Sequence, residues 1–374
     1  MRHAVALSLL LLAVTPACGD DDGPSTPGPD TGPGPDVVEP DAGPEPDAST
    51  DDAEIDLGPP IVASTAHCNY EPTPANANAT GPLDDGTLTA GVADVPIGLP
   101  VGSALGAYTA RASFLGESVT VDRRFVEISG AFVPSIGIET TPRIKVLALT
   151  AGSETLLLVK ADLGMTDENV VFDVAERLGP DYRGKVVITA SHSHSSFGHF
   201  STTSALGVGF GRFRQRSYDH LVTRIVEACQ SALAARSPAR IGIHHEPDFD
   251  PDDVVSHDRR DQNDDLPNGA NRKDHDLFVI RVDTADGAPM ALLPMFGVHG
   301  IISDFDNPYA STDAPGAMER VLEETFDRPV LVMHLQGAAG DVSPGGRGGI
   351  DCSGDLGCPA FARGESVGHL AVEP

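Results

Sequence analysis

The sequence predicts an α/β domain with a central mixed, largely parallel sheet flanked by helices. From about residue 88 onward, short apolar runs alternate with amphipathic segments of helical period. The apolar runs are hydrophobic on both faces, as strands are when helices cover both sides of a sheet. Three of these runs also end in segments rich in histidine, glycine or serine, and ligands usually bind such sheets beyond the carboxyl ends of the strands.

Two adjacent strands are expected over residues 143–151 and 154–163, because both runs are apolar and Gly152-Ser153 between them is a turn signal. Residues 166–179 then predict a helix, with Thr166 as its N-cap and Gly179 just past its end. The later elements follow from the same patterns: strands over 184–194, 239–247, 275–284 and 288–300, helices over 217–236 and 313–326, and a final strand entering a glycine-rich loop over 328–346.

The first residues of the chain predict an export signal. Residues 1–17 hold a weakly basic start and an apolar run of about a dozen residues, which is too short to be a permanent membrane helix. The junction with Cys18 resembles that of a bacterial lipoprotein, in which the cysteine carries the lipid anchor. An ordinary secretory signal with an incidental cysteine is the alternative. Gly19, rather than aspartate, follows Cys18, which favours the outer membrane or cell surface.

Residues 18–62 predict a disordered acidic tether, because they are rich in proline, glycine and aspartate and contain almost nothing that could be buried. The net charge of −30 lies largely in this tether and in the stretch after it, since no lysine or arginine occurs between Arg2 and Arg111. A strongly acidic chain without a basic patch argues against nucleic acid as a partner.

The remaining cysteines predict one short disulfide and one core residue. Cys352 and Cys358 close the loop "CSGDLGC", and disulfides are permitted in an exported protein. Cys229 lies on the apolar stripe of the expected helix 217–236 and is read as a buried thiol. A cysteine zinc site is not expected, because no pair of CxxC units occurs.

Three strand ends carry the candidate functional residues. "ITASHSH" ends in His192 and His194, "MFGVHG" presents His299, and "LQGAAGDVSPGG" presents Ser343. Residues i and i+2 of an extended segment project to the same side, so the first two histidines can face one pocket with Cα atoms about 6–7 Å apart. Each histidine taken alone favours a structural role over a functional one. Together, at corresponding strand ends, the three histidines predict a metal or substrate site.

These segments resemble the motifs of a known family. "ASHSHSSFG" resembles the "THTHSGPGG" signature of the neutral, non-lysosomal ceramidases, and "LQGAAGDVSPGG" is similar to their "GDVSPN". "MFGVHGIISDFDNPYASTDAPGAMERVLEE" resembles their "FAVHGTSM…SGDNKGYAAYLLE" segment. "AGVADVPIGLPVG" and "LLLVKADLGM" are similar to the family's opening strand and to the strand before its histidine motif. The similarity runs in order from about Gly91 to Pro344.

The resemblance implies a zinc-dependent amidohydrolase that cleaves the N-acyl amide bond of ceramide or a related N-acyl lipid. It implies that His192 and His299 bind zinc, that His194 either supports the zinc ligands or orients the substrate, and that Ser343 attacks the amide carbon. Asp313 would support the zinc site from behind its ligands. Zinc would act as a Lewis acid on the amide oxygen and lower the pKa of a bound water that helps to deprotonate the serine.

Arg259 and Arg260 fall near a family arginine that contacts the acyl carbonyl end of the substrate. The implied organisation is a lipoprotein signal over 1–17, a tether over 18–62, and a ceramidase-like catalytic domain over 88–374 that is C-terminally incomplete. A lipid anchor on a long tether would suit a substrate in a membrane.

The sequence departs from the family at one point that bears on activity. The family's other zinc ligands, a glutamate and a tyrosine, come from well beyond "GDVSPN" and cannot be assigned here. A catalytically dead surface lipoprotein that serves as a binding module, and a metal hydrolase for another amide or ester, therefore stay open as alternatives. The acidic run over 248–265 lacks the D-x-D-x-D-G spacing of a calcium loop and is read as a solvated loop.

Overall fold

The computed structural model describes residues 88–111, 134–259, 273–346 and 360–372. The chain divides into two compact units, 1–82 and 83–374, and the described residues all lie in the second. The expected signal and tether, and with them Cys18, Arg260, Cys352 and Cys358, lie outside the described residues. Among the described helices, none is long and apolar enough to cross a membrane.

The described strands form a nine-stranded sheet in the order β11-β9-β8-β6-β1-β3-β4-β5, with β12 also paired to β9. Its strands are β1 (Leu88–Pro96), β3 (Arg143–Ala151), β4 (Glu154–Ala161), β5 (Val186–Ala190), β6 (Ser237–Glu246), β8 (Leu277–Thr284), β9 (Pro289–Phe296), β11 (Leu331–Val332) and β12 (Leu335–Gln336). Two short ribbons accompany it: β2 (Gly137–Ile138) with β10 (Tyr309–Ala310), and β7 (Ser256–Asp258) with β13 (Val342–Pro344).

The sheet is mixed as expected, but the expectation of a largely parallel sheet is wrong. The pairs β1/β3, β3/β4, β1/β6, β6/β8 and β8/β9 are antiparallel, whereas β4/β5, β9/β11 and β9/β12 are parallel. Short turns explain the difference, because a parallel pair needs a long crossover and a hairpin does not. Gly152 (φ 58°) and Gly287 (φ 90°) occupy the turns of the β3/β4 and β8/β9 hairpins and adopt the left-handed backbone that glycine tolerates.

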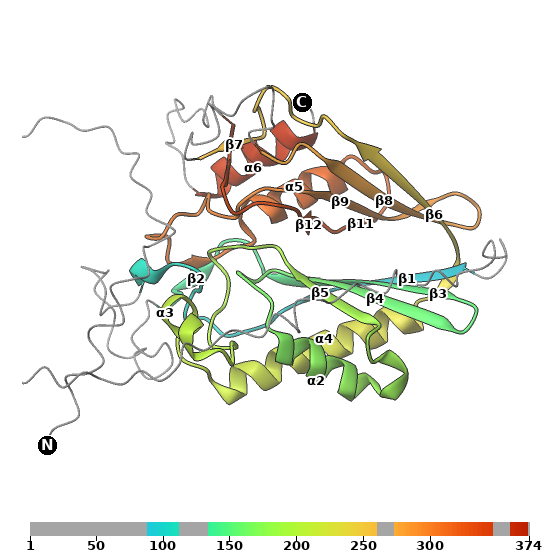
Figure 1. Cartoon of the computed structure of the whole chain (residues 1–374), viewed down its shortest axis with the longest axis horizontal. Coiled ribbons are helices and arrows are strands. Elements are labelled where there is room, and N and C mark those ends of the chain that lie inside the picture. Colours follow the sequence, from blue (N-terminus) through green and yellow to red (C-terminus); the bar gives the residue numbers. More distant parts are fainter. Residues whose placement is uncertain (1–87, 112–133, 260–272, 347–359, 373–374) are drawn as a thin grey trace, which may run out of the picture. The chain divides into compact units, whose positions relative to one another are not determined.

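The helices lie on the outer sides of two layers of strands (Figure 1). The first pair is α2 (Glu168–Leu178) and α4 (Gln215–Ala234), which cover β1, β3, β4 and β5. The second pair is α5 (Asp313–Glu324) and α6 (Ala360–Val372), which lie over β8 and β9. The sheet can fold into two layers because β1 meets β6 only where Thr89 and Ala90 pair with Pro238 and Ser237.

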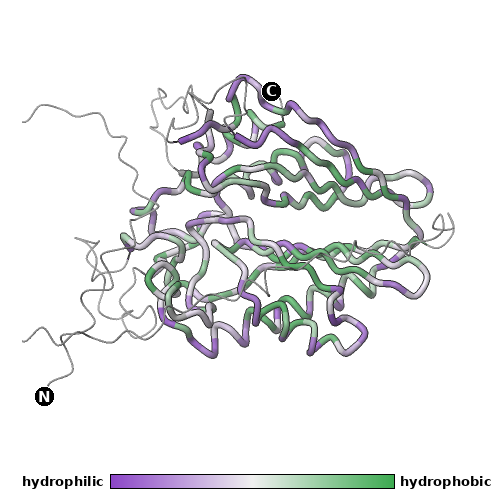
Figure 2. Tube along the Cα trace, viewed as in Figure 1, coloured by the Kyte–Doolittle hydropathy of each residue, from purple (hydrophilic) through white to green (hydrophobic). Residues whose placement is uncertain are grey.

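Apolar side chains pack between the strands and the helices and between the two strand layers. Strands β3, β4 and β9 are largely hydrophobic in Figure 2. The larger cluster joins β1, β3, β4 and β5 to α2 and α4 and includes the buried thiol Cys229, as predicted. A second cluster lies between the strand layers, where Leu147 meets Leu293 and Met333. Gly91 allows α4 to approach β1 closely, since an added Cβ would lie 2.2 Å from the carbonyl oxygen of Ala232.

The helix expected over 166–179 forms, but with a different N-cap. Asp167, not Thr166, is the capping residue, and its carboxylate accepts a hydrogen bond from the backbone N–H of Asn169 at 3.0 Å. Both residue types cap helices well, so local preference did not decide between them. Asp167 also accepts a hydrogen bond from the N–H of Thr202, which couples the helix start to the loop after the histidine motif.

Short connecting elements complete the described chain. They are the 3-10 turns η3 (Thr109–Arg111), η5 (Pro180–Tyr182) and η6 (Ser204–Leu206), and the single helical turn α3 (Gly207–Phe210). The strand expected over 184–194 ends at Ala190, so the histidine motif lies in a loop rather than in a strand. The strands β5, β9 and β12 thus lead into loops that carry the candidate site residues.

A candidate metal site at the ends of β5 and β9

Two loops bring His192, His194 and His299 together. The first loop follows β5 and the second follows β9, and they are joined by a parallel bridge between Ser193 and Gly300. The N–H of His194 donates a hydrogen bond to the carbonyl of Gly300 at 2.8 Å. Glycine is required there, because an added Cβ would lie 2.5 Å from the carbonyl oxygen of His192. The loops therefore approach closely enough for their imidazole rings to meet.

The three Nε2 atoms face one another. The distance is 3.0 Å between His192 and His299, 3.0 Å between His194 and His299, and 3.3 Å between His194 and His192. Two nitrogens bound to a tetrahedral zinc ion at about 2.0–2.1 Å would lie about 3.3–3.4 Å apart. The three rings thus match the spacing of a metal site, and they are the group of described residues that could hold an ion.

The hydrogen bonds behind two of the rings explain why a cation fits. His192 donates from Nδ1 to the carbonyl of Gly164 at 2.6 Å, and His299 donates from Nδ1 to the carbonyl of Ala339 at 2.9 Å. A neutral ring that donates from Nδ1 carries a lone pair on Nε2. Two lone pairs 3.0 Å apart repel unless a proton or a metal ion lies between them. Metal-binding histidines are typically oriented by such carbonyl bonds.

Burial favours the neutral, metal-binding form of His192 and His194. Desolvation lowers the pKa of His192, and the nearby charge of Arg259 lowers it further. The pKa of His194 lies well below its usual value, first because of burial and then because of His192 and His299. Neutral imidazole is the ligand form, so metal binding at this site needs no deprotonation at neutral pH. His192 also adopts a left-handed backbone (φ 62°), a strained conformation that is typical of functional sites.

His194 differs from the other two histidines. Its Nδ1 is buried and has no hydrogen-bond partner among the described residues, so its ring is not oriented in the way that those of His192 and His299 are. The ring of Tyr108 packs edge-on against it, with centroids 4.6 Å apart. The ring of His194 is therefore not oriented by a hydrogen bond at Nδ1, unlike the rings of His192 and His299.

Tyr108 and Arg111 are site residues that the sequence reasoning missed. Arg111 is 1% exposed, lies behind His194 and donates to the His194 carbonyl. Its other acceptors are the carbonyls of Gly106, Asp304, Phe305 and Asn307 and the hydroxyl of Ser195. Burial lowers the pKa of Arg111 to about 10, although it stays protonated at neutral pH. The signal was available: Arg111 is the first basic residue after Arg2.

Asp313 supports the loop that carries His299, which is the kind of role expected for it. Its buried carboxylate accepts hydrogen bonds from the N–H groups of Ile302 (2.9 Å), Ser303 (3.0 Å) and Ala314 (2.7 Å). These bonds fix the turn after His299 to the start of α5. Burial raises the pKa of Asp313, and the backbone donors oppose that shift.

Ser343 lies on a ribbon that is attached to the histidines. It belongs to β13, whose partner β7 leads directly to Arg259. The loop before β13 supplies the Ala339 carbonyl that orients His299, and Arg259 donates from Nη2 to the carbonyl of Gly340 at 2.9 Å. The charge of Arg259 acts on His192 and His194. The structure thus places Arg259 and the Ser343 loop next to the three histidines.

The acidic run over 248–265 is only partly the expected solvated loop. Asp248 and Asp252 are exposed, and residues 260–265 lie outside the described residues. Asp250 and Asp253 are buried, and the ammonium group of Lys273 bonds to Asp250 and lies 3.1 Å from Asp253. Asp250 also accepts hydrogen bonds from the N–H groups of Val254 and Ser256. An internal lysine thus supplies the positive charge that a calcium ion would have brought. Sequence could not show this, because Lys273 is 23 residues from Asp250.

The family follows from comparison with known proteins. Residues 136–361, more than half of the chain, match the model of the neutral/alkaline non-lysosomal ceramidase N-terminal domain. The chain belongs to the neutral/alkaline ceramidase family. The match includes the three histidines, Asp313 and Ser343.

Relatives of this ceramidase-family chain are much longer than the region they share with it. Neutral ceramidase A of Dictyostelium discoideum is 26% identical over 199 residues, which are 48% of this chain and 27% of that protein. The neutral ceramidase of Pseudomonas aeruginosa is 30% identical over 104 residues, 26% of this chain and 16% of that protein. This chain therefore spans less than a third of the length of these two relatives in the matched regions.

Solved ceramidase structures show the same fold. The crystal structure of the Pseudomonas aeruginosa neutral ceramidase superposes with a TM-score of 0.63 at 20% identity, covering 78% of this chain and 45% of that one. A ceramidase complexed with C2 gives a TM-score of 0.61 at 20% identity, covering 76% and 43%. The mixed sheet with its helices is thus the ceramidase scaffold.

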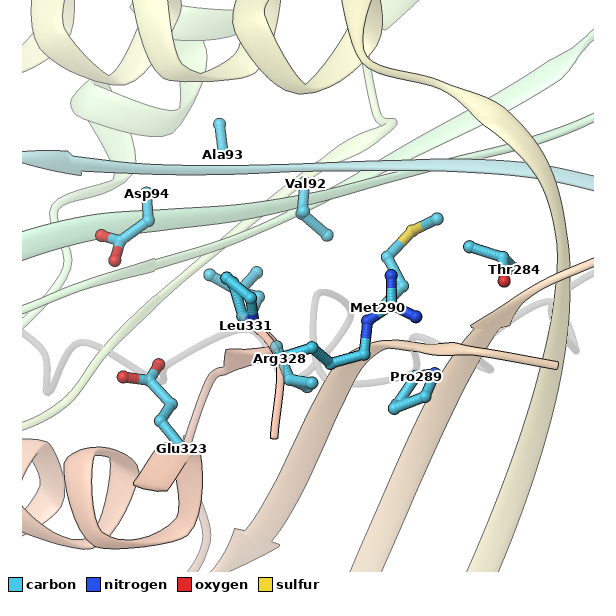
Figure 3. A pocket seen from close by; sticks show the side chains of 11 residues that line it. Val92, Ala93, Asp94, Thr284, Pro289, Met290, Glu323, Arg328 and Leu331 are labelled. Carbon is cyan, nitrogen blue, oxygen red and sulfur yellow. The ribbon is translucent and has the colours of Figure 1, made fainter. Parts of the chain in front are cut away.

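One cavity of the ceramidase fold lies away from the histidine site. A cavity of about 520 Å3 lies between β1 and the start of β9 and β11, where Asp94, Glu323 and Arg328 surround Val92 and Leu331 (Figure 3). None of its lining residues belongs to the histidine loops or to the β7/β13 ribbon. Its two acidic residues are also paired elsewhere, since Asp94 bonds to Arg143 and Glu323 bonds to Lys145.

Proposed function

We propose that this chain is a zinc-dependent amidohydrolase that cleaves the N-acyl amide bond of ceramide or a related N-acyl lipid, with Ser343 as the nucleophile. The observation that carries the proposal is the convergence of three Nε2 atoms beside the Ser343 loop, in a chain that belongs to the ceramidase family. Its place would be in sphingolipid metabolism.

His192 and His299 would hold the zinc ion, because both rings are oriented by a carbonyl and both point Nε2 at the same place. A zinc ion held there would supply a Lewis acid for the amide oxygen. His194, whose ring is less constrained, would orient the substrate or complete the nitrogen ligands. Asp313 would keep the His299 loop in place through the turn that it binds.

Ser343 would attack the amide carbon, and Arg259 would bind the acyl carbonyl end of the substrate. The support for these roles is that the Ser343 loop bonds directly to His299 and that the Arg259 charge reaches the histidines. A serine attack divides amide hydrolysis into two easier steps, formation and breakdown of an acyl ester. Arg260 would assist Arg259 from the adjacent position.

The location of the protein is part of the proposal. Export through residues 1–17, lipidation at Cys18 and a tether over 18–62 would place the enzyme on the outer membrane or cell surface, within reach of lipid substrates. A disulfide between Cys352 and Cys358 would be stable in that compartment. The motif residues support export, and mass spectrometry of the mature protein from cells would test lipidation at Cys18.

Activity and metal content of the purified protein test the function. We expect about one zinc ion per chain and hydrolysis of N-acylsphingosine, with no measurable rate after Ser343→Ala. Ser231→Ala, on the exposed side of α4, is the matched control and should leave the rate unchanged. A panel of N-acyl amino acids and carboxylic esters would identify a different hydrolase. A metal-free chain, or a rate that survives Ser343→Ala, would favour a non-catalytic binding module or another nucleophile.

A further inference from the structure

We propose that His257 and Ser343 form a serine–histidine pair, in which the His257 ring takes the proton of the Ser343 hydroxyl. The inference rests on the proposed function, since it needs Ser343 as the attacking group, and it adds a base that the histidine cluster does not provide. It begins from the β7/β13 ribbon, in which Ser343 is the cross-strand partner of His257.

The two side chains lie on the same face of the ribbon. Directly opposed residues of an antiparallel pair project to the same side, with Cβ atoms about 4.5–5.5 Å apart. The burial pattern fits this alternation, because Ser343 and His257 are half-buried while the neighbouring cross-strand pair, Val342 and Asp258, is 1% exposed at both residues. The reactive face is thus open to a substrate, and the opposite face is packed into the protein.

The ribbon is attached to the metal site at one end. Arg259 follows β7 directly, and its Nη2 donates to the carbonyl of Gly340 at 2.9 Å. The neighbouring Ala339 carbonyl accepts the hydrogen bond that orients His299, at 2.9 Å. The loop that enters β13 thus joins the Ser343 ribbon to the histidine cluster.

The His257 ring has a nitrogen available for Ser343. Its Nδ1 is buried and makes no hydrogen bond with any described residue. Staggered rotamers of opposed serine and histidine side chains can bring the hydroxyl and a ring nitrogen within about 3 Å, the distance that proton transfer requires. Such contacts are often longer in the absence of substrate than in its presence.

The backbone before His257 is held rigidly, which positions the pair. The N–H of Ser256 donates to Asp250 at 3.0 Å, and Lys273 donates to the Ser256 carbonyl at 2.5 Å. On the other side, the N–H of Arg259 donates to the Asp341 carbonyl at 3.0 Å. A base fixed by bonds on both sides loses little orientation when the substrate binds.

The proposed reaction needs only the amide substrate and one water molecule. As the Ser343 Oγ bonds to the amide carbon, its proton passes to the His257 ring. The C–N bond then breaks, and the departing amine takes the proton from His257, leaving an acyl ester on Ser343. Water attacks the ester carbon and gives a proton to His257, which returns it to Ser343 Oγ as the fatty acid leaves.

Labelling by a fluorophosphonate tests the pair separately from amide hydrolysis. This electrophile reacts with activated serines, and peptide mass spectrometry would locate the label and measure its rate on the full chain. We expect His257→Ala to slow labelling of Ser343 about 100-fold or more, in the range that general bases contribute. Added imidazole should restore much of the rate. His257→Gln, which is polar and of similar size, should be slow as well.

His245→Ala is the matched control, because His245 is an exposed histidine on β6 that stacks on Phe278. It should label at the unaltered rate, and all variants should keep their metal content and melting temperature. Labelling of His257→Ala within about twofold of the unaltered protein overturns the pair. If imidazole does not restore labelling of the slow His257→Ala variant, the pair is also overturned, because a merely structural role of His257 predicts that result. The pair is likewise overturned if Ser343 of the unaltered protein is not labelled.

The two proposals fail in different ways. If amide hydrolysis depends on Ser343 but neither it nor labelling changes in His257→Ala, the proposed function stands and the pair is wrong. If labelling of Ser343 depends on His257 and is restored by imidazole, but no amide or ester is cleaved, the pair stands and the proposed function is wrong. The same purified variants serve both measurements.

Discussion

Two buried polar clusters of this protein differ in how their charges are balanced. The histidine site brings together three rings whose Nε2 atoms lie 3.0–3.3 Å from one another, and backbone carbonyls orient two of them. The second cluster, which we call the charge network, consists of Lys145, Lys160, Asp162, Glu319 and Glu323 between β3, β4 and α5. Four of its five residues are at most 3% exposed, yet every one has an oppositely charged partner.

The charge network is complete by itself. Glu319 lies 2.9 Å from the ammonium groups of both Lys145 and Lys160, and its carboxylate also accepts the N–H of His334 at 2.7 Å. Burial alone would raise the pKa of Glu319, but the two lysines lower it. Burial would likewise lower the pKa of Lys145, but Glu319 and Glu323 raise it above its usual value.

The comparison teaches how to distinguish a structural cluster from a binding site. In the charge network and in the Asp250–Lys273 loop, the fold supplies its own cation. In the histidine site, the Nε2 atoms of three rings converge, and a cation bound between them would relieve the repulsion of their lone pairs. Buried polar groups normally find partners, so three ring nitrogens directed at one common point indicate a site that a metal ion can complete.

Removal of a metal ligand should have the largest effect, which is the loss of zinc binding. If zinc binding survived, the histidine cluster would not differ from the charge network in the way described. We expect His299→Ala to abolish stoichiometric zinc binding. Changing a residue that only hydrogen-bonds to a metal ligand lowers metal affinity roughly 10- to 100-fold, and removing the ligand itself should lower it further. His194→Ala should retain measurable binding, since that ring lacks an orienting bond. Isothermal titration with zinc measures both. Equal losses in the two variants would make His194 a full ligand.

Disruption of the charge network should come next and should act on stability alone. We expect Glu319→Gln to lower the free energy of unfolding by about 3–5 kcal/mol, because it leaves two buried ammonium groups short of a partner. Urea denaturation measures the loss. Glu176→Gln is the control, because Glu176 of α2 forms a solvent-exposed ion pair with Arg183. This substitution should change the free energy of unfolding little. Loss of zinc binding in Glu319→Gln without loss of stability would show that the two clusters are not separate.

The smallest effect concerns His334, which links the charge network to β9. Burial lowers its pKa to about 4, against an ordinary value of 6.5. Between these values the unfolded chain binds a proton that the folded chain does not, so this residue lowers stability as the pH falls from 6.5 to 4. The full contribution is about 3 kcal/mol.

Urea denaturation at several pH values checks this expectation. The free energy of unfolding of His334→Gln should fall less steeply than that of the unaltered protein between pH 6.5 and 4. At pH 7.5 the His334 ring and the glutamine that replaces it are both uncharged. The difference in free energy of unfolding at that pH therefore reports the lost contact with the Phe296 carbonyl. Parallel curves over the whole range would contradict the assigned pKa.

Part of the fold and of the site follows from local patterns. The β3/β4 hairpin was predictable because Gly152 marks a turn between two apolar runs, and α4 because its apolar stripe has helical period. His192, His299 and Ser343 could be chosen from three motifs and their order. Strand direction was less predictable, since alternating strands and helices suggested parallel pairs where short connections make hairpins. Tyr108 and Arg111 were missed because neither lies in a recognisable motif.

The sequence by itself determined which segments become strands and helices, which loops carry reactive groups, and to which family the chain belongs. These properties depend on periodicity and on motifs of a few residues, which are local. Only the tertiary structure decided that three Nε2 atoms meet, that Lys273 and the charge network neutralise their acids internally, and that His257 faces Ser343. Those relations join residues far apart in the chain, and they depend on register and packing that no local pattern specifies.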